Sequence, residues 1–275
     1  MSLSPLGRGQ GEGRLVMTSD LYSYGLLAIF LVSAAVILGC SEIGRRLGVR
    51  STGRGGKSIS TLESAILALL ALMVGFTFAM ALSRFEGRRE AVLNEANAIG
   101  TTALRARLLP PPHRAETLKL LKEYVKIRID ITERPLSLET MNAAIARSNE
   151  IHEALWQQVK AVATKDTEMV PTGLFIQALN EMIDDHEKRL TAGRNRVPNV
   201  VLLALYGLAA VASGFTGYAS GIEARRSRLP VYITGIVLCA VILLIQDLDR
   251  PSAGFITISQ QPMIDTAASI AGFVD

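Results

Sequence analysis

The chain of 275 residues contains only two cysteines, Cys40 and Cys239, and three histidines, His113, His152 and His186. Both cysteines lie inside apolar runs, so the sequence excludes a disulfide framework and a zinc site built on thiolates. The histidines are too few and too scattered along the chain for a histidine-rich metal site. We therefore predict that the protein holds no metal ion and needs no cofactor.

Aromatic residues and the signature motifs of enzymes are also scarce. Only 5% of the residues are aromatic and the net charge is +4, so nucleic-acid binding is not indicated. The pair His152-Glu153 is not followed by a second histidine at the metalloprotease spacing. No phosphate-binding glycine loop follows a strand, and no nucleophile elbow is present. The sequence thus predicts no catalytic residues, and we expect a protein that is not an enzyme.

What the sequence has instead is a set of long apolar runs. The mean hydropathy is +0.30 and 20% of the residues are charged, against ~25% in a typical soluble domain. Each run is long enough to cross the ~30 Å hydrocarbon layer as a helix, and none has a charge at its centre. We predict an all-α integral membrane protein with four transmembrane helices in two hairpins. The predicted spans are residues 21–40, 62–82, 197–220 and 229–248.

The charged residues lie between and around these runs, which divides the chain into segments. Residues 1–20 are polar and rich in glycine, so we expect a disordered leader there. A polar loop is expected at 41–61, inside the first hairpin. The predicted segments after the leader are the first transmembrane hairpin (21–82), a soluble domain (83–196), the second transmembrane hairpin (197–248) and a C-terminal tail (249–275).

The soluble segment 83–196 carries 18 basic and 16 acidic residues, so it is highly charged but nearly neutral. Its apolar residues recur at spacings of three and four, which are those of one helix face. His152 and His186 fall on two of these apolar faces. We expect the first helix to continue straight out of the second span, because nothing there except Gly87 disfavours a helix. The predicted helices are about 84–108, 114–133, 138–163 and 172–193.

Two of the predicted spans carry small residues at regular spacing. They recur every four residues in the second span and every seven in the third, which lets helix backbones approach closely. This packing is expected either within the chain or between subunits. The helix-packing residues are Ala71, Gly75 and Ala79 in the second span, and Gly207, Gly214 and Gly221 in the third.

A second stripe, Ala68, Leu72 and Phe76, runs beside the small residues of the second span. Such a stripe usually faces lipid or the protein core, and a less common role is a hydrophobic constriction in a pore. Just beyond this span, Glu90, Asn94 and Glu95 are expected either to line a vestibule or to face a neighbouring helix.

The fourth predicted span ends in two acidic residues and one basic residue, Asp247, Asp249 and Arg250. Carboxylates at a helix C-terminus meet the negative end of the helix macrodipole, so another group should offset them. One interpretation is a salt bridge with Arg250 or with the basic residues near Arg84 or Arg194. The other is an ion or gating contact at the membrane rim.

From about Leu62 to its carboxyl terminus the chain resembles the bacterial bestrophin-like membrane proteins, whose function is unknown, and more distantly the bestrophin anion channels. The segments that carry the resemblance are Gly75-Phe76-Thr77-Phe78, Arg84-Phe85-Glu86, Glu95-Ala96-Asn97-Ala98-Ile99-Gly100, Leu179-Asn180-Glu181-Met182-Ile183-Asp184, Arg194-Asn195-Arg196-Val197-Pro198, Tyr218-Ala219-Ser220-Gly221, Asp247-Leu248-Asp249-Arg250-Pro251 and Ser259-Gln260-Gln261-Pro262.

The resemblance implies a multi-pass protein of the cell membrane with both termini and the helical domain in the cytoplasm. It also implies self-association, with a homopentamer as the suggested form, and inorganic anions as partners beside the lipid bilayer. Ala68, Leu72 and Phe76 match the apolar neck of the bestrophin pore, although Ala68 is small where a bulky residue is expected. The chain lacks the long acidic run that binds calcium in animal channels, so we predict no calcium gating.

Two functions follow from these observations. The first is an oligomeric anion channel whose second transmembrane helix lines the pore. The alternative is a membrane-anchored sensor or scaffold whose helical domain lies outside the cytoplasm and binds a ligand or partner. Charge does not decide the orientation, because the loops hold eight basic residues on one side and ten on the other.

Overall fold

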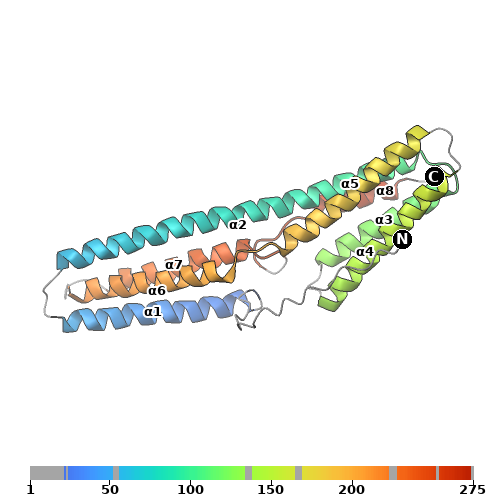
Figure 1. Cartoon of the computed structure of the whole chain (residues 1–275). Coiled ribbons are helices and arrows are strands. Elements are labelled where there is room, and N and C mark those ends of the chain that lie inside the picture. The colour runs from blue at the N-terminus through green and yellow to red at the C-terminus, as the bar shows by residue number, and fades with distance from the viewer. Residues whose placement is uncertain are drawn as a thin grey trace, which may run out of the picture.

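The computed structural model describes residues 22, 24–51, 56–133, 138–164, 169–222, 228–251 and 254–273, and over these residues its only regular secondary structure is helical (Figure 1). The predicted all-α fold is therefore confirmed for the described part of the chain. The predicted leader at 1–20 lies outside it. The helices are α1 (Leu26–Arg50), α2 (Gly56–Ala106), α3 (His113–Glu133), α4 (Leu138–Ala163), α5 (Met169–Arg194), α6 (Asn199–Ile222), α7 (Leu229–Leu248) and α8 (Gln261–Ala271).

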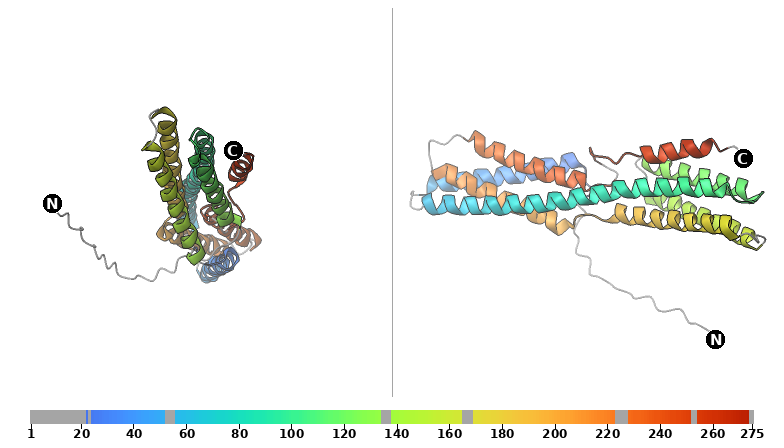
Figure 2. Two further views of the ribbon diagram at one scale, coloured as in Figure 1. Left: turned by 90° about the vertical axis from the view of Figure 1, so that its right-hand side faces the viewer. Right: turned by 90° about the horizontal axis from the view of Figure 1, so that it is seen from above.

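The molecule is elongated and has two halves (Figures 1 and 2). One half contains α1, α6, α7 and the first part of α2, and it provides four helical stretches long and apolar enough to cross a membrane. The other half is a bundle of α3, α4, α5, α8 and the second part of α2. The protein is thus a multi-pass membrane protein with a helical bundle at one end.

Helix α2 belongs to both halves, as the sequence predicted. It runs for 51 residues without a proline, which corresponds to a length of about 76 Å. A single buried stripe follows it from end to end. Leu70 and Ala81 are buried in the membrane half, and Val92, Ile99 and Ala106 are buried in the bundle.

The first helix departs from its predicted bounds. The expected span was 21–40 with a loop at 41–61, but α1 continues to Arg50 and α2 already begins at Gly56. The expected loop is wrong because Gly44 and Gly48 allow α1 to pack closely on α6. Ion pairs within this polar end of α1 also stabilise the helix, because Glu42 contacts Arg45 at 2.7 Å and Arg46 at 2.9 Å.

Each half has its own apolar core. In the bundle the core includes Tyr124, Leu155 and Phe175, and in the membrane half it includes Ile37 and Leu205. The tail also contributes to the bundle, because α8 buries Met263 and Ile270 and the Thr266 hydroxyl donates to the Ala96 carbonyl at 3.2 Å. The sequence analysis did not predict this helix.

Candidate functional site

One face of α2 has no partner among the described residues of the chain. The predicted pore stripe Ala68, Leu72 and Phe76 lies on it, with Leu72 56% and Phe76 67% exposed. The opposite face of the same segment packs into the membrane half through Leu70 and Ala81. The structure therefore presents the three residues together, on the side of α2 that points away from the other helices.

The small residues of α2 lie on this same unpartnered side. Ala71, Gly75 and Ala79 are exposed, and no atom lies within 4 Å of the position that a Cβ on Gly75 would occupy. No described helix of this chain packs on these residues. Packing within the described part of the chain is therefore wrong for these three residues, and contact with another subunit stays a prediction.

The glycines of α6 behave differently from those of α2. A Cβ on Gly214 would lie 3.7 Å from the Cys40 carbonyl oxygen, and a Cβ on Gly221 would lie 2.3 Å from that of Arg45. Gly207 has open space around it. Two of the three predicted packing positions on α6 thus face α1.

One of the closest approaches between α1 and α6 is at Gly217, which lies outside the predicted series of glycines at every seventh residue. A Cβ on Gly217 would lie 2.0 Å from the Ser41 carbonyl oxygen, inside any permitted contact. On α1, a Cβ on Gly44 would lie 2.0 Å from the Gly214 carbonyl oxygen, and a Cβ on Gly48 would lie 2.2 Å from that of Tyr218. Sequence analysis missed these two glycines because it placed residues 41–61 in a loop.

The junction between the two halves, called the rim below, contains buried charged residues. They are Arg88, Asp247, Asp249 and Arg250. Asp247 holds the segment that follows α7 in place. Its two carboxylate oxygens accept hydrogen bonds from the backbone N–H groups of Phe255 (2.9 Å) and Ile256 (3.1 Å). Gly254 leaves room for this loop, since a Cβ there would lie 2.1 Å from Asp247 Oδ1. The contacts seen for Asp247 are structural, and an ion contact at this residue stays a prediction.

Asp249 joins three separate segments of the rim. It is fully buried and accepts hydrogen bonds from the backbone N–H of Val197, at 2.7 Å, and from the hydroxyl of Tyr22. Arg84 of α2 lies 3.9 Å from its other carboxylate oxygen. Arg84 is thus one of the cations considered from the sequence that lie beside Asp249.

Two buried arginines complete the rim. Arg88 Nη2 donates to the carbonyl of Leu248 at 2.8 Å, so a cation sits at the C-terminal end of α7 and offsets the helix dipole there. Arg250 Nη2 donates to the carbonyl of Tyr24 at 2.7 Å. The rim therefore ties α2, α6 and α7 to the segment that precedes α1.

A second polar cluster lies inside the bundle, around Glu95 of α2. This carboxylate has no exposed surface and contacts Arg128 of α3 at 2.8 Å and Arg189 of α5 at 2.6 Å. The Tyr124 hydroxyl donates to it at 2.6 Å and lies 2.8 Å from His186 Nδ1. Because a hydroxyl carries one proton, it accepts a hydrogen bond from His186, which places a proton on Nδ1.

The charges of this cluster explain its ionisation. Burial raises the pKa of Glu95, but the bond with His186 and the charges of Arg128 and Arg189 outweigh it and hold that pKa well below its usual range. Burial, reinforced by the Glu95 charge, raises the pKa of Tyr124 well above its usual value. Glu95 is therefore ionised and Tyr124 neutral at physiological pH. The expectation that Glu95 faces a neighbouring helix is met, and it does not line a vestibule.

His152 packs against this cluster, 5.0 Å from the Tyr124 ring and 4.9 Å from the His186 ring between centroids. Burial, then the neighbouring His186 and Arg128, lower the pKa of His152 to about 4, although Glu95 acts in the opposite direction. The neutral form of His152 therefore belongs to the folded state.

This makes the stability of the bundle sensitive to mild acid. The unfolded chain protonates His152 near pH ~6.5 and the folded chain only near its lowered pKa, so the free energy of unfolding falls as the pH drops between them. We expect a loss of roughly 2 kcal/mol between about pH 7 and pH 5, seen as a lower thermal midpoint. His152→Leu should flatten this dependence and His113→Leu should keep it, whereas equal slopes in the two variants would contradict the assignment.

Glu90 and Asn94, the other two polar residues predicted near a vestibule, remain on the surface. They line a groove of about 250 Å³ between α2 and α5, together with Asp185 and Lys188. Lys188 Nζ lies 2.7 Å from Asp185 Oδ1. Within the described ranges no group of three or more histidine, cysteine or acidic side chains is placed to hold a metal ion.

Four long apolar stretches, a rim of buried charges and a helical bundle define a multi-pass helical membrane protein. Over residues 30–263 the sequence matches the family described as the bestrophin-like domain. This region covers most of the chain. The chain belongs to the bestrophin-like family, as its resemblance to that family predicted.

Solved structures of bacterial proteins share this fold. A bestrophin homologue from Klebsiella pneumoniae matches with a TM-score of 0.64 and 15% identity, over 91% of this chain and 100% of that chain. A single-residue variant of a bestrophin homologue from the same organism matches with a TM-score of 0.65 and 16% identity, over 90% and 97%. Identity at this level shows the fold alone. No curated protein sequence matches the chain.

Proposed function

We propose that this protein is an oligomeric anion channel whose pore is lined by the unpartnered face of α2. The bundle would lie in the cytoplasm, and copies of the chain, five in the form that the family resemblance suggests, would surround the pore. The observation that carries the proposal is the exposure of Ala68, Leu72 and Phe76 on one side of α2. An apolar face of this kind gates by excluding water when several copies meet around an axis.

The small residues beside that stripe support the assembly. Gly75 has open space around it in the single chain, and Ala71 and Ala79 continue the same exposed line. Small residues in membrane helices allow close contact between backbones, so this line suits the approach of a neighbouring α2. Subunit contact along Gly75 would turn Phe76 toward the axis.

The experiment that tests the proposal is a halide-flux assay on the protein reconstituted into liposomes. Phe76→Ala should raise the flux several-fold or change the selectivity among anions, because it removes the bulkiest side chain of the constriction. Phe78→Ala is the matched control, since it removes the same side chain from a position about 160° away around the helix.

Two results would contradict this role of α2. One is unchanged flux and selectivity in Phe76→Ala while the unmodified protein conducts. The other is an effect of Phe78→Ala as large as that of Phe76→Ala. A reconstituted protein that passes no halide under any condition would contradict the channel itself.

A further inference from the structure

An apolar groove of about 370 Å³ runs along the outer side of the membrane half, between α1 and α6. Six of its lining residues come from α1, two come from α6, and Tyr24 lies just before α1. The nine residues are Tyr24, Ala28, Ile29, Val32, Ser33, Val36, Ile37, Leu203 and Tyr206. The groove therefore lies within segments that cross the bilayer.

Two polar groups along this groove, the hydroxyls of Ser33 and Tyr206, are already bonded inside the protein. Ser33 Oγ donates to the carbonyl of Ile29 at 2.7 Å, and the Tyr206 hydroxyl donates to Gln246 Oε1 at 3.2 Å. The walls of the groove therefore present mainly hydrocarbon to a bound molecule, and few groups that can form hydrogen bonds. Such a surface suits a chain of methylene groups.

The length of the groove fits one leaflet. From its first residue, Leu26, to Val36, α1 rises by about 15 Å, which is half of the ~30 Å hydrocarbon layer. Tyr24 stands at the rim end, where amphipathic aromatic rings are favoured at the membrane surface. An occupant that starts at Tyr24 therefore ends near the bilayer midplane, as an acyl chain does.

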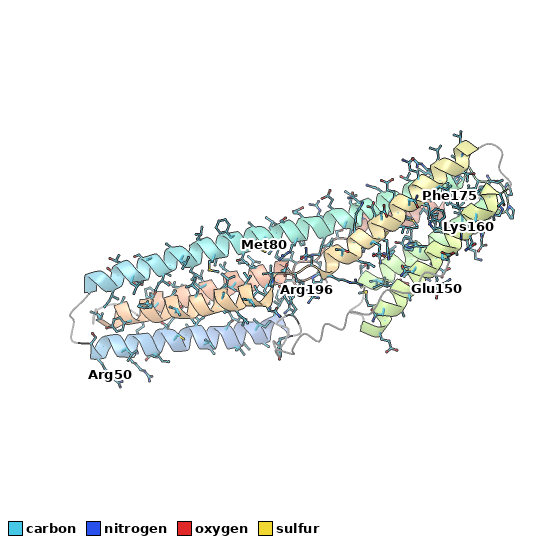
Figure 3. The ribbon with its side chains drawn as sticks, in the orientation of Figure 1. Arg50, Met80, Glu150, Lys160, Phe175 and Arg196 are labelled. Atoms are coloured by element: carbon cyan, nitrogen blue, oxygen red, sulfur yellow. The ribbon has the colours of Figure 1, made fainter. Side chains whose placement is uncertain are left out.

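Cations lie at the rim end of the groove. Arg250 donates to the carbonyl of Tyr24 at 2.7 Å, and the guanidinium of Arg196 lies 4.9 Å from the ring centroid of Tyr22. Figure 3 shows Arg196 at the junction of the two halves, where α5 gives way to α6. Two arginines thus lie near the mouth of an apolar groove, at the level of the lipid headgroups, and the Asp249 carboxylate that accepts from Tyr22 lies close to them.

We propose that this groove binds one acyl chain of an anionic phospholipid, whose phosphate lies beside Arg196. Three features favour this ligand: the hydrocarbon walls, the length of one leaflet and the cations near the mouth. This site is separate from the unpartnered face of α2. It does not depend on whether the protein conducts anions.

The test measures lipid that stays bound to the purified protein. The detergent-solubilised full chain is mixed with phosphatidylglycerol or phosphatidylcholine of identical acyl chains. Bound lipid is counted by native mass spectrometry and its effect is followed by the thermal midpoint. We expect the unmodified protein to retain phosphatidylglycerol in preference to phosphatidylcholine and to melt at a higher temperature with it.

Filling the groove should remove this site. Ala28→Trp and Val32→Trp should each lower the affinity for phosphatidylglycerol about tenfold or more and abolish the rise in midpoint. Leu31→Trp is the matched control, because Leu31 is an exposed neighbour on α1 that does not line the groove. Val32 is 65% exposed, so Val32→Trp tests the groove even where Ala28→Trp fails to fold.

The headgroup contact is tested separately with Arg196→Gln. This variant should lose the preference for phosphatidylglycerol while it keeps its binding of phosphatidylcholine. Equal lipid retention by Val32→Trp and Leu31→Trp would overturn the proposal. So would a change in the number of subunits in Val32→Trp without a change in bound lipid, since a second copy of the chain would then occupy the groove.

Discussion

Glu95→Ala is expected to destabilise the bundle by about 3–5 kcal/mol, which is enough to prevent stable folding at ordinary temperatures. The carboxylate has no exposed surface, and its removal leaves the buried Arg128 and the largely buried Arg189 with no opposing charge in contact among the described residues. The measurement is the thermal midpoint of the detergent-solubilised protein, together with the fraction that elutes as a single species. Both should fall sharply.

Glu153→Ala is the control for this prediction. Its carboxylate lies on the surface of α4, 4.0 Å from Lys160, and exposed pairs contribute only about 0–1 kcal/mol. The midpoint of Glu153→Ala should stay close to that of the unmodified protein. If Glu95→Ala melted at the same temperature as Glu153→Ala, the buried cluster would contribute no net stability.

Gly217→Val is expected to separate α1 from α6. The first atom of the new side chain would lie 2.0 Å from the Ser41 carbonyl oxygen, which belongs to the backbone and cannot rotate away. Overpacking a well-packed site usually costs about 1–3 kcal/mol, and a clash with backbone lies at the upper end of this range or beyond it. Monodisperse protein after extraction in detergent should therefore decrease strongly.

The same substitution elsewhere on α6 provides the comparison. Gly207→Val places its side chain in open space, so its yield and thermal midpoint should resemble those of the unmodified protein. Equal loss in both variants would show that β-branched residues are poorly tolerated anywhere on α6. The close approach of α1 at Gly217 would then not be the cause.

Features that depend on local pattern could be predicted from the sequence. The apolar runs were sufficient to identify four spans. The absence of proline was sufficient to predict that the helix of the second span continues into the bundle as one helix, α2. Apolar periodicity also placed His152 and His186 on core faces, where the structure buries them. Each of these predictions uses neighbours that lie within one helix.

Features that depend on contacts between distant segments could not be predicted. The helical end of α1 looks like a loop because Glu42 and Arg45 are charged, and only α6 shows why Gly44 and Gly48 are needed. Glu95 lies three residues after Val92, which is a spacing of one helix face, but the sequence left open whether it lines a vestibule or faces a neighbouring helix. Its partners on α3 and α5 nevertheless have no signature in the sequence.

Because α2 is one continuous helix, the direction in which its residues face in the membrane half fixes the direction in which they face in the bundle. An added residue would turn everything after it by about 100°, which would move Glu95 out of the bundle while Phe76 stayed in place. An addition of seven residues returns the helix to within about 20° of its original setting. An addition of eleven residues, about three turns, does the same. The distance along α2 between the membrane and the bundle can therefore change only by close to whole numbers of turns, so the spacing of the two halves is restricted to a few discrete values.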